Sequence, residues 1–429
     1  MSIRDMVASS RADIDGAYVT PNMDIADWKK MSVSEYNSRI DDAVEFRNKE
    51  MGKSYPTEWR DKHRPHWGGI RQKYITADMI RHFAYTIGDP NPLWSDPDYA
   101  RNTRWGGIIG PPIFEDSVSG PHAIRDPLRL PGCQLFDWGA EREYFMVLRP
   151  GDQIITAEDT CLGITEETKP GMTYRLFVEK SRRDHYNNRG EKVWSVIAAG
   201  LVAAVHPAHY EEYGRQVSAR ITRARYTQEQ LDELHTYYDE LLEGKWIRGS
   251  EIRYWEDIRV GDEIPSVIRG PLDDSDQRSF MGGGFFVGIG AFATYWAAVK
   301  GGRPVLEFTD PETGVYLDDW NWHCSDAEAR RRALPYGIGS GKQNETAVSH
   351  AITNWMGDDG IVKKLALHIL GVEWTAFHGD MSWAKGKVTR KYVDNGEHLV
   401  DLEVWSENQR GQLYTQGSAT VRLLSREES

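Results

Sequence analysis

The pattern of apolar and polar positions changes several times along the chain, and each change predicts a different kind of element. Between Met79 and Ile87 apolar residues recur every three or four positions, behind a Thr76 that is suited to cap a helix. A helix is therefore predicted there, ending at the Gly88–Pro92 turn, where two prolines prevent its continuation. From about residue 139 to 206 the pattern becomes strand-like, in four segments separated by turns rich in Gly, Pro and Asn.

The second part of the chain repeats this change from helix to strands. Residues 216–250 are charged and predict a connecting helix, opened by a possible capping box at Thr227 and Gln230. A strand is predicted at 252–260, before a Gly261-Asp262 turn, and an apolar helix-like stretch at 349–356. The strand-like segments that follow are 366–376, 382–392, 398–407 and 413–424.

The two strand-rich regions share an order of features that indicates an internal duplication. Each has a Gly-Asp turn, at Gly151-Asp152 and Gly379-Asp380, then a long hairpin. Each then has an Asn/Arg/Gly turn, at 187–190 and 408–411, and a last apolar strand. We therefore predict one structural plan used twice. The predicted boundaries are 1–65 for a helical N-terminal arm, 66–215 for the first unit, 216–250 for a linker helix and 251–429 for the second unit.

Composition and charge narrow the class of protein. The 429 residues include 16 Trp, 20 Tyr and 12 Phe, enough to bury a large core. No apolar run approaches the ~18 residues that span a bilayer, and no apolar leader precedes the first polar segment, so we expect a cytoplasmic protein without a membrane partner. Three Cys lie too far apart for a disulfide framework or a zinc motif. The net charge of -13 argues against a nucleic-acid partner, and an anionic substrate would require a local basic patch.

The turn after the first predicted helix carries the most specific motif. It reads Gly-Asp89-Pro-Asn91-Pro-Leu-Trp94-Ser-Asp, with Ala100 six residues after Trp94 and a Gly110-Pro-Pro segment beyond. This resembles the signature of the MaoC-like, (R)-specific enoyl-CoA hydratases, which is Gly-Asp-x-Asn-Pro-aliphatic-His-x-Asp. The resemblance implies an α+β fold class, a tandem (double) hotdog fold whose antiparallel sheets each wrap a central helix. It also implies a catalytic Asp/His pair.

The first unit departs from that signature at the histidine. Trp94 stands in its place, and an indole offers only an N–H donor and cannot transfer protons. We therefore expect the first unit to be catalytically degenerate. Asp89, Asn91 and Trp94 are assigned to substrate binding or to the structure of the turn rather than to catalysis.

The second unit offers a histidine in the same register. Asp318 and His323 are spaced like Asp89 and Trp94, and Ala329 lies six residues after His323. Asp89 precedes Gly151 by 62 positions (151 − 89), and Asp318 precedes Gly379 by 61 (379 − 318). Asp318 and His323 are therefore predicted as the catalytic pair. Because the Asn-Pro core is replaced by Trp-Asn-Trp, the neighbouring Asp319 stays an alternative to Asp318.

Two further features lie close to that motif. Gly339-Ser340-Gly341-Lys342 lacks the spacing of a phosphate-binding loop, but its register matches the loop before the first unit's central helix. Backbone N–H groups at a helix N-terminus hold an oxyanion, so Gly339 and Gly341 are predicted to contact the thioester oxygen. Arg330 opens a run of three arginines that is predicted to meet a phosphate of coenzyme A.

The resemblance implies a hydro-lyase that reversibly hydrates a 2-enoyl-CoA to a 3-hydroxyacyl-CoA. It implies no metal and no cofactor beyond the coenzyme A of the substrate, and a homo-oligomer as the assembly. Two alternatives stay open. One is a non-catalytic or heteromeric acyl-CoA-binding double hotdog, and the other is a hotdog acyl-CoA thioesterase, which would use a carboxylate on the central helix such as Glu345.

Overall fold

The computed structural model describes residues 30–56, 74–119, 132–219, 221–282, 321–331, 333–370 and 376–427. In these ranges the strands form one ten-stranded sheet in the order β1-β3-β4-β5-β2-β7-β10-β9-β8-β6, with every pair antiparallel. The strands are β1 (Ser54–Pro56), β2 (Cys133–Tyr144), β3 (Ile154–Glu166), β4 (Arg175–Asn187), β5 (Lys192–Ala204), β6 (Glu263–Arg269), β7 (Ile361–Ile369), β8 (Ser382–Asp394), β9 (Glu397–Asn408) and β10 (Leu413–Arg422).

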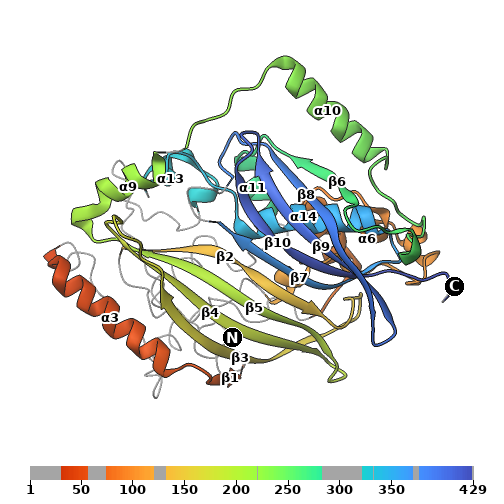
Figure 1. Cartoon of the computed structure of the whole chain (residues 1–429), viewed down its shortest axis with the longest axis horizontal. Helices are drawn as coiled ribbons and strands as arrows, with labels where there is room; N and C mark the ends of the chain where they lie inside the picture. Colours follow the sequence, from red (N-terminus) through yellow and green to blue (C-terminus); the bar gives the residue numbers. More distant parts are fainter. Residues whose placement is uncertain are drawn as a thin grey trace.

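The sheet consists of two halves that join edge to edge, as Figure 1 shows. The first half holds β2 to β5, which are the four strands predicted between 139 and 206. The second holds β6 to β10, and the seam is the pairing of β2 with β7, from Gly139 opposite His368 to Glu143 opposite Lys364. Because the seam is a regular antiparallel pairing, neither half has a free edge there.

The Gly-Asp turns of the two halves form corresponding hydrogen bonds and ion pairs. The Asp152 carboxylate accepts from the Arg149 N–H at 2.9 Å, and the Asp380 carboxylate accepts from the Phe377 N–H at 3.2 Å. Each carboxylate also pairs with the arginine of its Asn/Arg/Gly turn, at 3.5 Å for Arg189 and 2.9 Å for Arg410. The predicted tandem (double) hotdog fold is therefore confirmed, with one plan used twice.

The helix α14 (Gly341–Met356) is the central helix of the second half and is buried over almost its whole length. Its apolar side packs into a cluster with β6, β7, β8, β9 and β10, through Ala347, Val348, Ala351, Ile352 and Trp355. Its other side carries buried polar residues and approaches β2 of the first half. In the first half the corresponding helix begins as α8 (Glu115–Ser119), beyond which residues 120–131 lie outside the described ranges.

Most of the predicted helix boundaries are confirmed. Thr76 caps α5 (Ala77–Thr86) by accepting from the Met79 N–H at 3.2 Å, and Thr227 and Gln230 form the capping box of α10 (Gln228–Leu242). Within the predicted arm, α3 (Val33–Lys49) packs on the first half through Tyr36, Ile40 and Ala43, left of the sheet in Figure 1. The remaining helices are α6 (Pro92–Ser95), α7 (Pro97–Arg101), α9 (Tyr210–Ser218), α11 (Asp274–Phe280) and α13 (Asp326–Arg331).

The strand predicted at 252–260 is wrong. Trp255–Asp257 form a 3-10 helix, and β6 begins only after the Gly261-Asp262 turn. The indole N–H of Trp255 donates to the Leu399 carbonyl at 3.0 Å, which draws this segment across the end of β9 instead of along the sheet. Among the described helices, none combines the length and apolar character needed to cross a bilayer.

Candidate functional site

The motif of the first half forms a rigid, buried turn after α5. The Asn91 side chain accepts from the Leu93 N–H at 2.9 Å and so caps α6, where Pro92 suits the first helical position. Asp89 is held at both oxygens, by the Asn91 N–H at 3.0 Å and by the indole N–H of Trp94 at 3.0 Å. Trp94 thus occupies the histidine position as a hydrogen-bond donor to the motif carboxylate.

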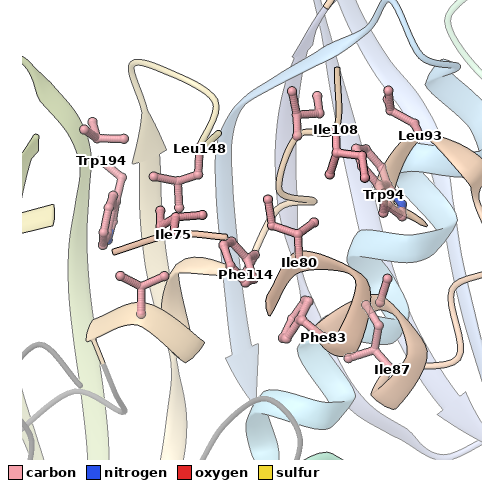
Figure 2. Packing of buried hydrophobic residues seen from close by; sticks show 14 of the residues in the cluster. Ile75, Ile80, Phe83, Ile87, Leu93, Trp94, Ile108, Phe114, Leu148 and Trp194 are labelled. Atoms are coloured by element: carbon pink, nitrogen blue, oxygen red, sulfur yellow. The ribbon is translucent and has the colours of Figure 1, made fainter. Parts of the chain in front are cut away.

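The surroundings of Trp94 are those of a core residue. Figure 2 shows it among the packed apolar side chains of the first half, and it is 2% exposed. Asn91 is likewise 2% exposed and is used as a helix cap. Of the three residues predicted here for substrate binding, Asp89 lines the larger and Trp94 the smaller of two cavities that the described residues form.

In the second half the predicted histidine lies against the loop that leads into α14. His323 ends the 3-10 helix Asn321–His323 and is 6% exposed. Its Nδ1 lies 2.8 Å from the carbonyl oxygen of Ile338, which can only accept, so Nδ1 carries a proton and donates it to this carbonyl. Asp318 and Asp319 lie outside the described residues.

A second histidine fixes the backbone of this motif. The His378 Nε2 donates to the His323 carbonyl at 3.0 Å, and the His378 Nδ1 lies 2.9 Å from the Asp326 carboxylate. The residue before His323, Trp322, packs on Phe136 of β2 with ring centroids 5.2 Å apart. The motif of the second half is therefore anchored to both halves of the sheet.

The two predicted oxyanion glycines differ in their surroundings. The Gly339 N–H donates to the Ala376 carbonyl at 2.7 Å and is therefore occupied. Gly341 is the first residue of α14, and no side-chain capping bond from Ser340 is present within the described residues. A Cβ at Gly341 would lie 2.5 Å from Ile369 Cδ1 and 2.7 Å from Asp137 Cβ, so glycine permits this helix end to approach β7 and β2.

Arg330 lies on the exposed side of α13. Its guanidinium donates to the Pro335 carbonyl at 3.4 Å, and it is not among the described residues that line these two cavities.

A buried charge network joins the two halves beneath the sheet seam. Arg142 of β2 pairs with Glu115 at 3.0 Å, with Asp116 at 2.8 Å and with Glu345 of α14 at 2.7 Å. Lys342 also contacts Glu345 at 3.0 Å. Burial is the largest influence on Glu115 and raises its pKa to about 7 against the pull of Arg142. Both oxygens of Glu345 are thus taken up by fixed cations.

The residue that the sequence did not indicate is His350 of α14. Its Nε2 lies 3.4 Å from the Asp89 carboxylate of the first half, and both side chains are buried. Burial lowers the pKa of His350 to about 4, opposed by Asp89, so the imidazole is neutral near neutral pH. In the sequence, the only available sign of His350 was a run of polar residues inside an apolar helix. Its neighbour Asp89 lies in the other half and is far away along the chain.

This fold is that of a double hotdog protein, and comparisons with known proteins show what the chain is similar to. Residues 66–196 match the family model described as "FAS1-like, dehydratase domain region". A solved structure described as a MaoC-like dehydratase has a TM-score of 0.55 at 14% identity, with 88% of this chain and 99% of that chain covered. The resemblance predicted from the motif around Asp89 is thereby confirmed.

Two curated relatives match a short part of the chain. A UPF0336 protein of Thermobifida fusca is 34% identical over 94 residues, which are 21% of this chain. A UPF0336 protein of Streptomyces avermitilis is 31% identical over 84 residues, or 19% of this chain. The matches span 61% and 56% of those relatives' own lengths.

Proposed function

We propose that the protein reversibly hydrates a 2-enoyl-CoA thioester to a 3-hydroxyacyl-CoA thioester in the second half of the sheet. The observation that carries the proposal is the placement of His323. Its ring is held at 2.8 Å from Ile338, three residues before α14 begins at Gly341. An imidazole and a helix N-terminus are two of the three groups that this reaction requires.

The proposed chemistry moves protons and one oxygen atom. His323 Nε2 removes a proton from water as the water oxygen bonds to C3 of the enoyl group, with Asp318 as the paired carboxylate. The electrons of the double bond shift towards the thioester oxygen. As the thioester carbonyl re-forms, C2 receives the proton that the His323 and Asp318 pair took from water, so no proton is gained or lost. Dehydration is the same path reversed, and it requires no metal and no redox cofactor.

The developing negative charge on the thioester oxygen needs donors. Gly341 and the following N–H groups of the first turn of α14 point out of the helix without an intrahelical partner. The Gly339 N–H is already bonded to Ala376, so of the two predicted glycines Gly341 stays the proposed donor. Arg330 stays the proposed contact for a coenzyme A phosphate, which a chain of net charge -13 must meet with local cations.

The thioesterase alternative finds less support. Such an enzyme would need a reactive carboxylate on α14, and Glu345 is engaged by Arg142 and Lys342. A binding protein without activity is the other alternative.

A homo-oligomeric assembly and a cytoplasmic location also stay predictions.

The experiment is an assay of the purified protein with short, medium and long trans-2-enoyl-CoAs. Loss of the conjugated enoyl absorbance without release of thiol is expected for at least one chain length. Release of free coenzyme A from saturated acyl-CoAs would support the thioesterase instead. Tight binding of acyl-CoAs with neither reaction would support the binding protein and overturn the proposed function.

A further inference from the structure

A large cavity is lined by residues of both halves. Its volume is about 1450 Å³, well above the 300–1,000 Å³ typical of small-molecule sites. Its walls come from α5 of the first half, α10 of the connector and β6 of the second half, with α14 at the inner side. Much of the wall is apolar, through Met79, Tyr85, Ile87, Leu241, Leu242 and Val267.

The exposed part of this wall includes two large apolar side chains. Tyr85 on α5 is 80% exposed and Leu242 on α10 is 75% exposed, and both border the cavity. Apolar side chains at the rim of a cavity offer a surface on which a hydrophobic group is removed from water. The mouth of the cavity is therefore suited to a hydrophobic group.

Three polar residues form the inner end of the cavity. They are Asp89 from the first half, and Arg269 and His350 from the second. Arg269 is anchored on α14, because its guanidinium donates to the Thr346 hydroxyl at 2.9 Å. Burial lowers the pKa of Arg269 while the charge of Asp89 opposes the shift, so these two groups are electrostatically coupled.

His350 is the group that indicates a ligand. It is 1% exposed, yet neither ring nitrogen has a hydrogen-bond partner of good geometry among the described residues, and Asp89 at 3.4 Å is its nearest charge. A buried polar group left without a partner is unfavourable and therefore rare in native proteins. A polar atom that enters the cavity would supply the missing bond.

The charges of Asp89 and Arg269 indicate which kind of polar group the cavity would bind. A carboxylate would meet the negative charge of Asp89, and an ammonium would meet the positive charge of Arg269. A hydroxyl fits both, since it donates to Asp89 or to the neutral His350 and accepts from Arg269. The remaining wall is suited to the hydrocarbon that carries this hydroxyl.

We propose that this cavity binds the acyl part of the substrate and that Asp89, His350 and Arg269 recognise a hydroxyl group carried on it. The inference rests on the proposed function. Gln343, in the first turn of α14, and His350 both line the cavity, and seven helical residues at 1.5 Å each separate them. The recognised hydroxyl therefore lies about 10 Å further along the helix than the end where the thioester is proposed to bind.

The catalytic test compares a medium-chain trans-2-enoyl-CoA bearing a terminal hydroxyl with its unsubstituted analogue. A hydrogen bond to a charged group is equivalent to a preference of about 10- to 100-fold, so wild type should favour the hydroxylated substrate by that factor in kcat/KM. In His350→Phe and in Asp89→Asn this ratio should fall towards one. His235→Phe, an exposed histidine on α10, is the matched control and should keep the wild-type ratio.

A binding test separates this inference from the proposed reaction. Saturated medium-chain acyl-CoA, with and without the terminal hydroxyl, is titrated calorimetrically into wild type and the same variants. Tighter binding of the hydroxylated compound by wild type alone supports the cavity assignment even if no enoyl-CoA is hydrated. Equal affinities for both compounds, unchanged in His350→Phe, overturn it even if hydration proceeds.

Discussion

At the scale of single residues, the side chains of His350 and Asp89 come from different halves of the sheet and lie 3.4 Å apart where the two halves meet. The register of the motif pointed to Trp94 and His323 in the sequence, but it did not indicate His350. Nor did it indicate that the Trp94 indole would bond to the motif carboxylate. A local pattern reports spacing along the chain, whereas these contacts depend on the assembled sheet.

The bond from Trp94 to Asp89 leads to a prediction about stability. Trp94→Phe removes the donor and leaves a buried carboxylate oxygen without it, so the free energy of unfolding should fall by about 1–3 kcal/mol. Urea denaturation measures this difference. Trp246→Phe is the control, since its indole bonds to Glu240 in a part-buried position and its loss should cost less. Equal losses in both variants would contradict the buried role of Trp94.

At the scale of elements, the strands and capped helices of both halves were predictable from periodicity and from turn residues. The strand expected at 252–260 was not, because the segment is drawn across β9 by Trp255. The pairing of β2 with β7 was also beyond the sequence. Both strands are apolar and alternating, and nothing local states which edges of two similar sheets will meet.

The close approach of the β10 and β7 backbones in the second half leads to a prediction about stability. Gly417 of β10 lies so near β7 that a Cβ there would be 1.9 Å from the Ala366 carbonyl oxygen. Gly417→Ala should therefore force the strands apart and destabilise the protein by about 1–3 kcal/mol in a denaturant titration. Gly107→Ala, where the space is open, should be close to neutral. A Gly417→Ala variant as stable as that control would contradict the observed packing of β10 on β7.

At the scale of the whole molecule, the duplication places two similar motifs on one sheet and lets them diverge. The first half carries Asp89 with Trp94 at the histidine position of the predicted motif, and the second half carries His323. The central helix of the second half lies near both, since α14 begins three residues after Ile338, to which His323 bonds, and carries His350 to Asp89. Duplication and motif spacing were visible in the sequence, but this sharing of one helix was not.

Two buried groups, His350 and Glu115, should make the free energy of unfolding depend on pH in opposite directions. His350 has a folded pKa of about 4 against an ordinary 6.5, beside Asp89 and Arg269. The unfolded chain therefore binds this proton first, and stability is lost as pH falls from 6.5 towards 4. Glu115, beside Arg142, has a folded pKa of about 7 against 4.5, so stability is lost as pH rises from 4.5 towards 7.

In wild type, the pH dependence of the unfolding free energy that comes from His350 and the one that comes from Glu115 should largely cancel between pH 4.5 and 6.5. In His350→Phe the contribution of Glu115 remains, so the unfolding free energy should decrease as pH rises from 4.5 to 6.5, by about 3 kcal/mol at most. In Glu115→Gln the His350 slope remains and the free energy should increase. Urea titrations at the two ends of the window measure both, and variants with slopes of the same sign would refute the assignment.

The central claim is that the second half performs the chemistry through His323. The most direct measurement is kcat for enoyl-CoA hydration by His323→Gln at saturating substrate, beside the exposed-histidine control His235→Gln. The account predicts a fall of about 10²- to 10⁴-fold for His323→Gln, with the folded state and substrate affinity retained, and wild-type turnover in the control. Wild-type turnover in His323→Gln would show that the proton transfer takes place elsewhere.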